Sequence, residues 1–243
     1  AKESEADALL SKGDVSGAWH AYTMAAEQFR MCDRPRDAVR LFEAVYGLVE
    51  ELSFPWLISR LHHVGSLTAL CRYASARNLL TSLDRTEIPS GLQELYLDLS
   101  VGVHLGCGEL ESALDTVAQL AEIDTERARL SYQFRYTELC FLQGFVDQAR
   151  EGIKRTEYLL SNQSRPEAGL AALCALRSEI LVFEGALDKA ELAQRNACTH
   201  LEQIRRLGPL LAAMGEWVWI CHRGGRMATA SWISRGIQWS RQR

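Results

Sequence analysis

The side chains that most often carry out chemistry in proteins, histidine and cysteine, are scattered along this chain without a catalytic pattern. His62 and His63 are sequence neighbours, so on a helix they point about 100° apart and cannot face one metal ion. His104 and Cys107 can share a helical face, but two ligands do not make a structural site. The sequence has no GxSxG elbow, phosphate-binding loop or HExxH motif. We therefore expect no enzyme activity, no cofactor and no metal site.

The seven cysteines are odd in number and widely spaced, and no two of them form a CxxC pair. This pattern disfavours a disulfide framework or a zinc site. Most of them lie close to positions where we expect turns, which favours a role as small apolar side chains. The cysteines indicate a reducing compartment, and we expect a cytoplasmic protein.

Arginine and tryptophan are concentrated at the C-terminal end. Residues 201–243 carry a net charge of +5, whereas the whole chain carries −4. Interleaved arginines and aromatic rings can bind nucleic acid, but the pI of about 5.9 is far from that of a nucleic-acid-binding domain. We expect no direct contact with nucleic acid. Trp217, Trp219 and Trp232 are expected in the core. A contact with a partner protein, or self-association, is expected at Arg235, Trp239 and Arg241.

A repeated turn positions these residues. Six times an alanine follows a small or polar residue by five positions, and successive alanines are 36 to 41 residues apart. A helix that doubles back needs a left-handed residue at its end, and glycine adopts that conformation at least cost. The alanine allows the two helix backbones to approach closely. The sequence therefore predicts an all-α repeat array, with these turn and alanine pairs: Asp33 and Ala38, Cys71 and Ala76, Gly108 and Ala113, Gly144 and Ala149, Gly185 and Ala190, Gly225 and Ala230.

The prolines support the same division into hairpins. Proline is tolerated in the first turn of a helix, where its missing N–H has no intrahelical partner. Pro35 is predicted to open a second helix, and Asp124–Glu126 is predicted to cap the first helix of the fourth hairpin. No segment alternates as a half-buried strand does. The remaining prolines are predicted to open first helices: Pro55, Pro89, Pro166 and Pro209.

Two stretches, residues 136–149 and 177–190, resemble the consensus of the tetratricopeptide repeat (TPR) family from first helix to second helix. The resemblance covers residues 17–243 and implies a right-handed superhelical solenoid of six antiparallel hairpins. Residues 1–16 are expected to form a short capping helix. The repeats exceed the usual length of about 34 residues, and they are similar to those of maltose-type bacterial transcription activators and of some eukaryotic adaptors. An unrelated α-solenoid is the alternative.

The resemblance implies which side chains line the concave surface, because in this family the first helix of each hairpin faces inward. Repeats two and three offer small residues at these positions, whereas repeats four to six offer carboxylates, aromatic rings and cations. The predicted site is the inner face of repeats four to six, with these residues: Phe134, Glu138, Phe141, Glu179, Trp219, His222 and Arg223.

Glu138 and Glu179 occupy equivalent places in neighbouring repeats, six residues before the turn glycine. If both face the groove, they suit a lysine, an arginine or another amine. The alternative is that both are solvated helix glutamates paired with Arg135 or Arg177. Members of this family that bind acidic C-terminal tails use Lys, Arg and Asn at the inner positions. The inner positions of this chain hold other residue types, so a carboxylate clamp is not expected.

These observations predict a non-catalytic scaffold that binds a protein or peptide along its groove, and the acidic groove predicts that this partner is basic. The alternative is the effector-sensing or oligomerisation arm of a multidomain transcriptional regulator that binds a small molecule. The chain is 47% hydrophobic and 24% charged, as is ordinary for a folded protein. It shows no membrane span or signal peptide. Because it starts without methionine, we expect a region of a longer regulatory protein.

Overall fold

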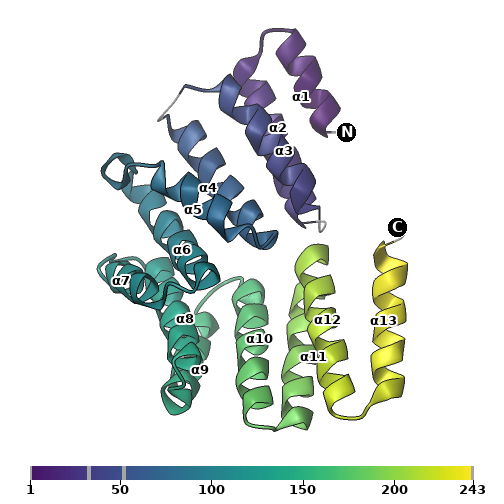
Figure 1. Ribbon diagram of the computed structural model, residues 1–243. Helices are drawn as coiled ribbons and strands as arrows, with labels where there is room; N and C mark the ends of the chain where they lie inside the picture. Colours follow the sequence, from purple (N-terminus) through teal and green to yellow (C-terminus); the bar gives the residue numbers. More distant parts are fainter. Residues whose placement is uncertain (1, 32–33, 51–52, 242–243) are drawn as a thin grey trace. The chain divides into compact units, whose positions relative to one another are not determined.

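The structure is a computed structural model that describes residues 2–31, 34–50 and 53–241. The described part of the chain is helical, with no strand, which confirms the all-α prediction (Figure 1). Two short 3-10 helices, η1 (Tyr46–Leu48) and η2 (Arg85–Glu87), interrupt the α-helices. The α-helices are α1 (Lys2–Ser11), α2 (Val15–Met31), α3 (Pro35–Val45), α4 (Phe54–Ala69), α5 (Tyr73–Thr81), α6 (Ser90–Cys107), α7 (Leu110–Ala121), α8 (Glu126–Leu142), α9 (Val146–Ser161), α10 (Glu167–Phe183), α11 (Leu187–Gln203), α12 (Leu207–Arg223) and α13 (Met227–Arg241).

The chain divides into two compact units, Ala1–Tyr132 and Gln133–Arg243. Helix α8 contributes residues to both units, and each unit has its own buried core. The expected division into residues 1–16 and 17–243 stays a prediction.

The turns have the predicted geometry. Each predicted turn residue in the described ranges has a positive φ; Asp33 lies outside them. Each of the six alanines is the fourth residue of its helix and is at most 5% exposed. Its N–H donates to the carbonyl of the residue that precedes the helix. The predicted turn residues in the described ranges, with their φ angles, are Cys71 (55°), Gly108 (76°), Gly144 (83°), Gly185 (75°) and Gly225 (72°).

A further copy of this turn, which the sequence pattern did not reveal, lies at the start of α2. Gly13 has a φ of 79°, and Ala18, five residues later, is fully buried as the fourth residue of α2. Asp14 caps α2 by accepting a hydrogen bond from the N–H of Gly17 at 2.9 Å. The copy escapes a search for a regular period because it stands only 20 residues before Ala38.

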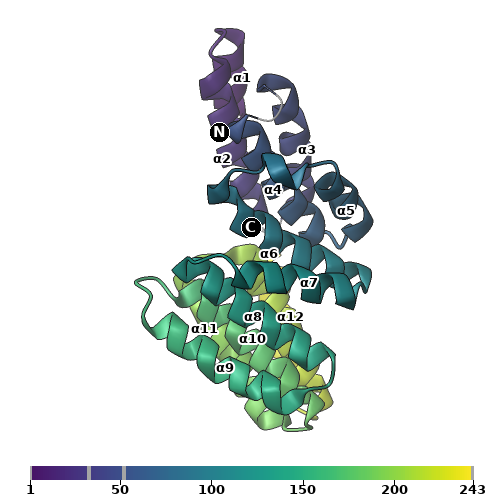
Figure 2. The same cartoon turned by 90° about the vertical axis from the view of Figure 1, so that its left-hand side faces the viewer.

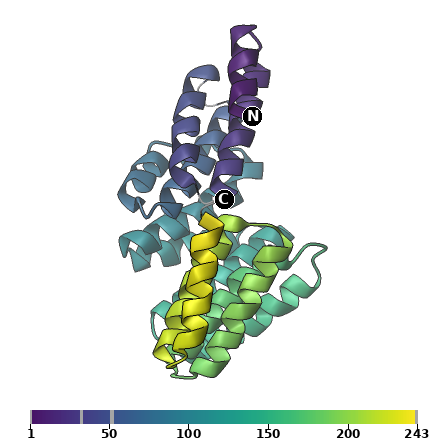
Figure 3. The ribbon, with the colours of Figure 1, turned by 90° about the vertical axis from the view of Figure 1, so that its right-hand side faces the viewer.

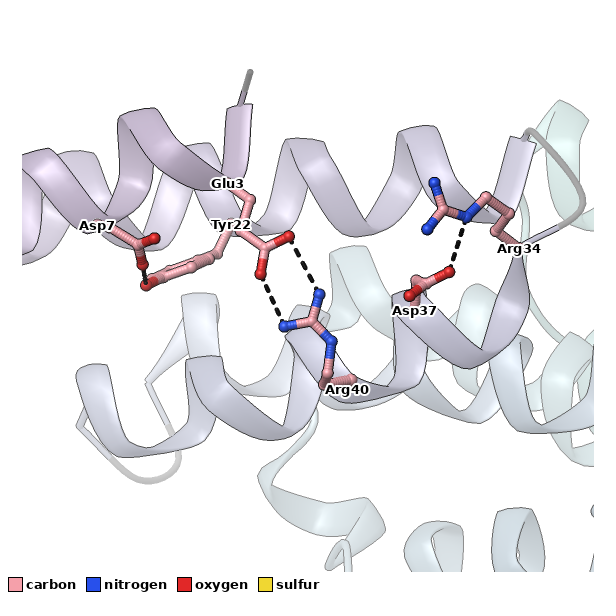
Figure 4. A network of polar contacts seen from close by, with 6 residues as sticks. All are labelled: Glu3, Asp7, Tyr22, Arg34, Asp37 and Arg40. Carbon is pink, nitrogen blue, oxygen red and sulfur yellow. Dashed lines mark hydrogen bonds and ion pairs between the residues drawn. The ribbon is translucent and has the colours of Figure 1, made fainter. Parts of the chain in front are cut away.

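Polar contacts attach α1 to the two helices that follow it (Figure 4). The Arg40 guanidinium of α3 donates to both carboxylate oxygens of Glu3, at 2.7 and 3.1 Å. The Tyr22 hydroxyl of α2 donates to Asp7, which raises the pKa of Tyr22 to about 12. Helix α1 therefore packs on α2 and is also connected to α3 by an ion pair.

Unit 1 is a series of packed hairpins. Helices α6 and α7 lie side by side in Figure 2, and α4 packs on both α5 and α6. The largest fully buried side chain is Phe42 of α3, whose ring stacks on His62 and His63 of α4 at centroid distances of 6.2 Å. This stacking connects the first hairpin to the second.

Unit 2 contains the hairpins that carry the predicted site. Helices α10 to α13 run side by side, with α13 at the end of the series (Figures 1 and 3). A Cβ atom on Gly152 of α9 would lie 2.2 Å from Oγ1 of Thr137, so α8 and α9 approach closely there. Between α10 and α11, the buried Ser178 hydroxyl donates to the carbonyl of Ala190 at 2.9 Å.

The prolines and the cap lie where the sequence predicted them. Pro35 is the first residue of α3 and Pro55 the second residue of α4. Thr125 caps α8, because its hydroxyl accepts a hydrogen bond from the N–H of Ala128 at 3.0 Å. Pro89 and Pro166 directly precede α6 and α10, and Pro209 lies in the first turn of α12.

Two expectations about burial were wrong. Trp219 is 46% exposed and Trp232 is 66% exposed, so neither is a core residue. Each lies on a helix face that no described element covers completely. Cys71 is also exposed, because a left-handed turn residue points away from the core, whereas Cys140, Cys198 and Cys221 are buried as expected. All six described cysteines are free.

No helix in the described ranges is long and apolar enough to cross a membrane.

Candidate functional site

The predicted site residues lie on the first helices of three consecutive hairpins, and those that the structure describes fully belong to unit 2. Their positions follow from the turn: each stands two to ten residues before the left-handed glycine that ends its hairpin's first helix. Helix α8 carries Phe134, Glu138 and Phe141, helix α10 carries Glu179, and helix α12 carries Trp219, His222 and Arg223.

A pocket of about 260 Å³ opens between α10, α11 and α12. Glu179 and Trp219, from different hairpins, both line it, so the fold brings these two predicted residues together. Apolar side chains form part of the wall and polar groups the rest. The lining residues are Ala175, Ser178, Glu179, Val182, Gln194, Glu216, Trp219 and Ile220.

The Glu179 carboxyl has an unfavourable environment for its negative charge. The surrounding protein atoms raise its pKa, and the carboxylates of Glu138 and Glu216 raise it further. The side chain remains open to solvent because it lies in a concave pocket. Among the described residues, no cation pairs with it: Arg177, the nearest expected partner, pairs with Glu157 of α9 instead.

Glu138 has a different environment from its repeat equivalent. The Arg135 guanidinium lies 3.0 Å from its carboxylate, one helical turn earlier on α8. The alternative that the glutamates pair with nearby arginines therefore holds for Glu138 and does not hold for Glu179. The reason lies three residues before each glutamate: α8 has Arg135, whereas α10 has the buried Leu176.

The aromatic residues do not form one cluster. The guanidinium of Arg223 lies 5.2 Å from the ring centroid of Trp219. Phe141 contacts Phe183 of α10 edge to face at 6.0 Å, and Phe183 is 70% exposed. The Phe134 ring instead lies 6.0 Å from the guanidinium of Arg135 on its own helix.

Two further predicted residues, His222 and Arg235, do not line the pocket, and the side chains of two others lie outside the described structure. His222 is exposed on α12 and does not line the pocket. Arg235 is exposed on α13. The side chains of Trp239 and Arg241 lie outside the part of the chain that the structure describes, so the predicted end contact stays a prediction.

Three polar residues of the pocket were not predicted from the sequence, among them Ser178, whose hydroxyl donates to the carbonyl of Ala190. Glu216 precedes Trp219 by three residues and therefore shares its helical face, which is a signal that the sequence contained. Gln194 lies on α11, a second helix, and the TPR resemblance assigns the inner face to first helices alone. Only the packed structure reveals that Gln194 reaches the pocket.

Comparisons with known proteins support the fold. No family model matches the chain, and no curated protein sequence matches it. The solved structure of a Rap protein complexed with competence and sporulation factor is similar over 99% of this chain and 74% of that one, with a TM-score of 0.65 at 13% identity. At this identity the likeness shows the fold alone. The chain is thus an all-α protein of TPR-like helical repeats.

Proposed function

We propose that this protein is a non-catalytic scaffold that binds a partner protein or peptide along α8, α10 and α12 of unit 2. The observation that carries this proposal is the Glu179 carboxylate. It lines an open pocket, has acidic neighbours and lacks a cationic partner among the described residues. A charge in such surroundings is stabilised best by an opposite charge, so the partner supplies a basic side chain.

The size of the pocket favours one side chain of a larger partner over a free small molecule. Pockets that enclose drug-sized ligands have volumes of about 300–1,000 Å³, and this pocket has about 260 Å³. The exposed Phe183, in contact with Phe141, adds an apolar surface on α8 and α10 for neighbouring residues of the partner. The similar Rap structure is itself a complex with a factor, which supports a binding role.

A regulatory role in the cytoplasm, as a region of a longer protein, is part of the same proposal. The free cysteines of the described chain are compatible with a reducing environment. The resemblance to maltose-type activators supports the alternative, an effector-sensing arm, which the experiment below distinguishes from a scaffold.

The test is selection from a displayed library of random peptides with the wild-type chain and with Glu179→Lys. We expect the wild type to enrich peptides that contain lysine or arginine, and Glu179→Lys to lose them. Glu202→Lys is the matched control, because Glu202 is exposed on α11 and does not line the pocket. Enrichment that survives in Glu179→Lys, or is lost equally in Glu202→Lys, would contradict the proposal. A small molecule retained by the wild type in native mass spectrometry, without peptide enrichment, would favour the sensor.

A further inference from the structure

Gln194 is a buried polar side chain with an unused acceptor at the pocket. It is 3% exposed, and its Nε2 donates to the carbonyl oxygen of Ala213 at 2.9 Å. That hydrogen bond fixes the orientation of the carboxamide, because only the nitrogen can donate to a carbonyl. Its oxygen consequently has no hydrogen-bond donor among the described residues, although Gln194 lines the pocket. The oxygen is not one of the buried side-chain atoms that lack a partner, so it is accessible from the pocket and can accept a hydrogen bond from a ligand.

The acceptors of the pocket come from three different helices. Glu179 of α10, Gln194 of α11 and Glu216 of α12 all line it. Within the described ranges, no three acidic, histidine or cysteine side chains are arranged to hold a metal ion. These oxygens suit an organic cation with donors that point in several directions.

The walls of the pocket favour a flat cation. Val182 and Ile220 present apolar surface, and Trp219 presents an indole ring. This ring already has a guanidinium beside it, that of Arg223, 5.2 Å from its centroid. A guanidinium is planar, more weakly hydrated than an ammonium, and donates five N–H groups in its plane while its faces stack on aromatic rings. An ammonium is more strongly hydrated than a guanidinium, so its transfer from water into the same pocket costs more free energy.

We propose that this pocket is a subsite for the guanidinium of an arginine side chain, in preference to the ammonium of lysine. The inference rests on the proposed function, since it specifies which basic group the Glu179 pocket takes. Glu179 and Glu216 supply the charge, Gln194 supplies a directed acceptor, and Trp219 supplies the stacking surface.

The test is an NMR titration with two small probes, Nα-acetyl-arginine methylamide and the corresponding lysine derivative, at constant ionic strength. We expect the arginine probe to shift the side-chain resonances of Gln194 and Trp219 and to bind about tenfold more tightly than the lysine probe. One additional hydrogen bond to a charged group increases the binding affinity by about tenfold. Equal affinities would overturn the guanidinium subsite and leave the cation site of the proposed function intact. No shift with either probe would overturn both.

Two variants test which side chains cause the preference for the arginine probe over the lysine probe. Gln194→Met keeps the length of the side chain and removes the acceptor, so the arginine probe should lose about tenfold in affinity while the lysine probe keeps its own. Trp219→Leu, at an exposed position that tolerates change, should reduce the same preference if Gln194→Met fails to fold. Glu179→Gln should weaken both probes. A preference unchanged in both Gln194→Met and Trp219→Leu would overturn the proposal.

Discussion

Unit 1 and unit 2 both place polar side chains between neighbouring hairpins, but the ring and guanidinium groups of α4 in unit 1 have contacts, whereas two acceptors at the pocket of unit 2 do not. In unit 1, His62 Nδ1 lies 2.9 Å from Glu27, His63 pairs with the hydroxyl of Tyr46, and the Arg60 guanidinium lies over two aromatic rings. In unit 2, Glu179 and the oxygen of Gln194 have no partner among the described residues.

This difference teaches how to interpret polar residues in a repeat protein. A buried polar group with an internal partner stabilises the packing of the hairpins. One that faces a pocket without a partner lowers stability and is available to a ligand. Unit 1 is therefore the better candidate for a structural role and unit 2 for a binding role.

The largest expected effect tests the aromatic residues of the two units. Phe42→Ala should lower the free energy of unfolding of unit 1 by about 3–5 kcal/mol, because it removes a fully buried ring and leaves a cavity. Phe183→Ala should change that of unit 2 by about 0.5 kcal/mol or less, because the ring is 70% exposed. Urea denaturation monitored by circular dichroism measures both. Equal losses of unfolding free energy in the two variants would contradict the view that Phe42 stabilises the core whereas Phe183 is available for binding.

The second prediction concerns the pH dependence of unit 1. Burial, helped by the Arg60 charge, lowers the pKa of His63 from its usual 6.5 to about 4. Its Nε2 is buried without a partner among the described residues, so a proton there gains no acceptor. The unfolded chain then binds the proton more tightly. Unit 1 should lose stability as the pH falls from about 6.5 to 4, by about 3 kcal/mol at most.

The measurement for this prediction is the urea midpoint as a function of pH for the wild type and for His63→Gln. The variant should lose stability overall but should lack the decline between pH 6.5 and 4. Glu27 contributes only at the lower end of this range: burial opposes its ionisation, but hydrogen bonds from His62 and Arg30 prevail and lower its pKa from 4.5 to about 2, so its contribution to stability declines only below about pH 4.5. A decline that persists unchanged in His63→Gln would assign the pH dependence to other groups.

A third, smaller effect compares the turns. Cys71 adopts a left-handed conformation that costs a non-glycine residue about 1–2 kcal/mol. Cys71→Gly should stabilise unit 1 by about 0.5 kcal/mol, after the extra freedom of glycine in the unfolded chain is subtracted. Gly144→Ala, at a φ of 83°, should instead destabilise unit 2 by about 1 kcal/mol. Thermal unfolding measures both, and the same sign for the two variants would contradict this account of the turns.

The smallest effect compares the two equivalent glutamates of unit 2. Glu179 has a pKa raised by burial and by its acidic neighbours, so its ionised form opposes folding at neutral pH. Glu179→Gln should therefore keep or raise the midpoint temperature of unit 2, by about 1 °C. Glu138→Gln removes the ion pair with Arg135 and should lower stability by about 0.3 kcal/mol. Differential scanning calorimetry measures both changes, and a clear loss of stability in Glu179→Gln would mean that it has a structural role.

Much of the fold could be predicted because the repeat depends on local chemistry. Gly108 and Gly144 stand where the chain must adopt a left-handed turn, and Ala113 and Ala149 stand where two helices approach. These requirements concern neighbouring residues in sequence and leave a visible period. The turn at Gly13 was missed because its copy lies outside that period.

The candidate site was only partly predictable. The first-helix positions of Glu179 and Trp219 follow from counting back from each turn, and both line the pocket. The sequence could not predict that Glu179 lacks a cationic partner among the described residues, because Arg177 is close to it in sequence but pairs with Glu157 of α9. Gln194 lies on a helix that the repeat pattern assigns to the other side.

The sequence by itself determined the helices, their turns and the alanines that allow them to pack, because each depends on backbone conformation and side-chain size within a few residues. Only the tertiary structure decided which polar groups find partners, since that depends on distances between side chains of different helices. Arg135 pairs with Glu138 one helical turn away, whereas Glu179 has acidic neighbours and no cationic partner among the described residues. Long-range packing, rather than the local pattern, thus distinguishes a stabilising glutamate from one available to a ligand.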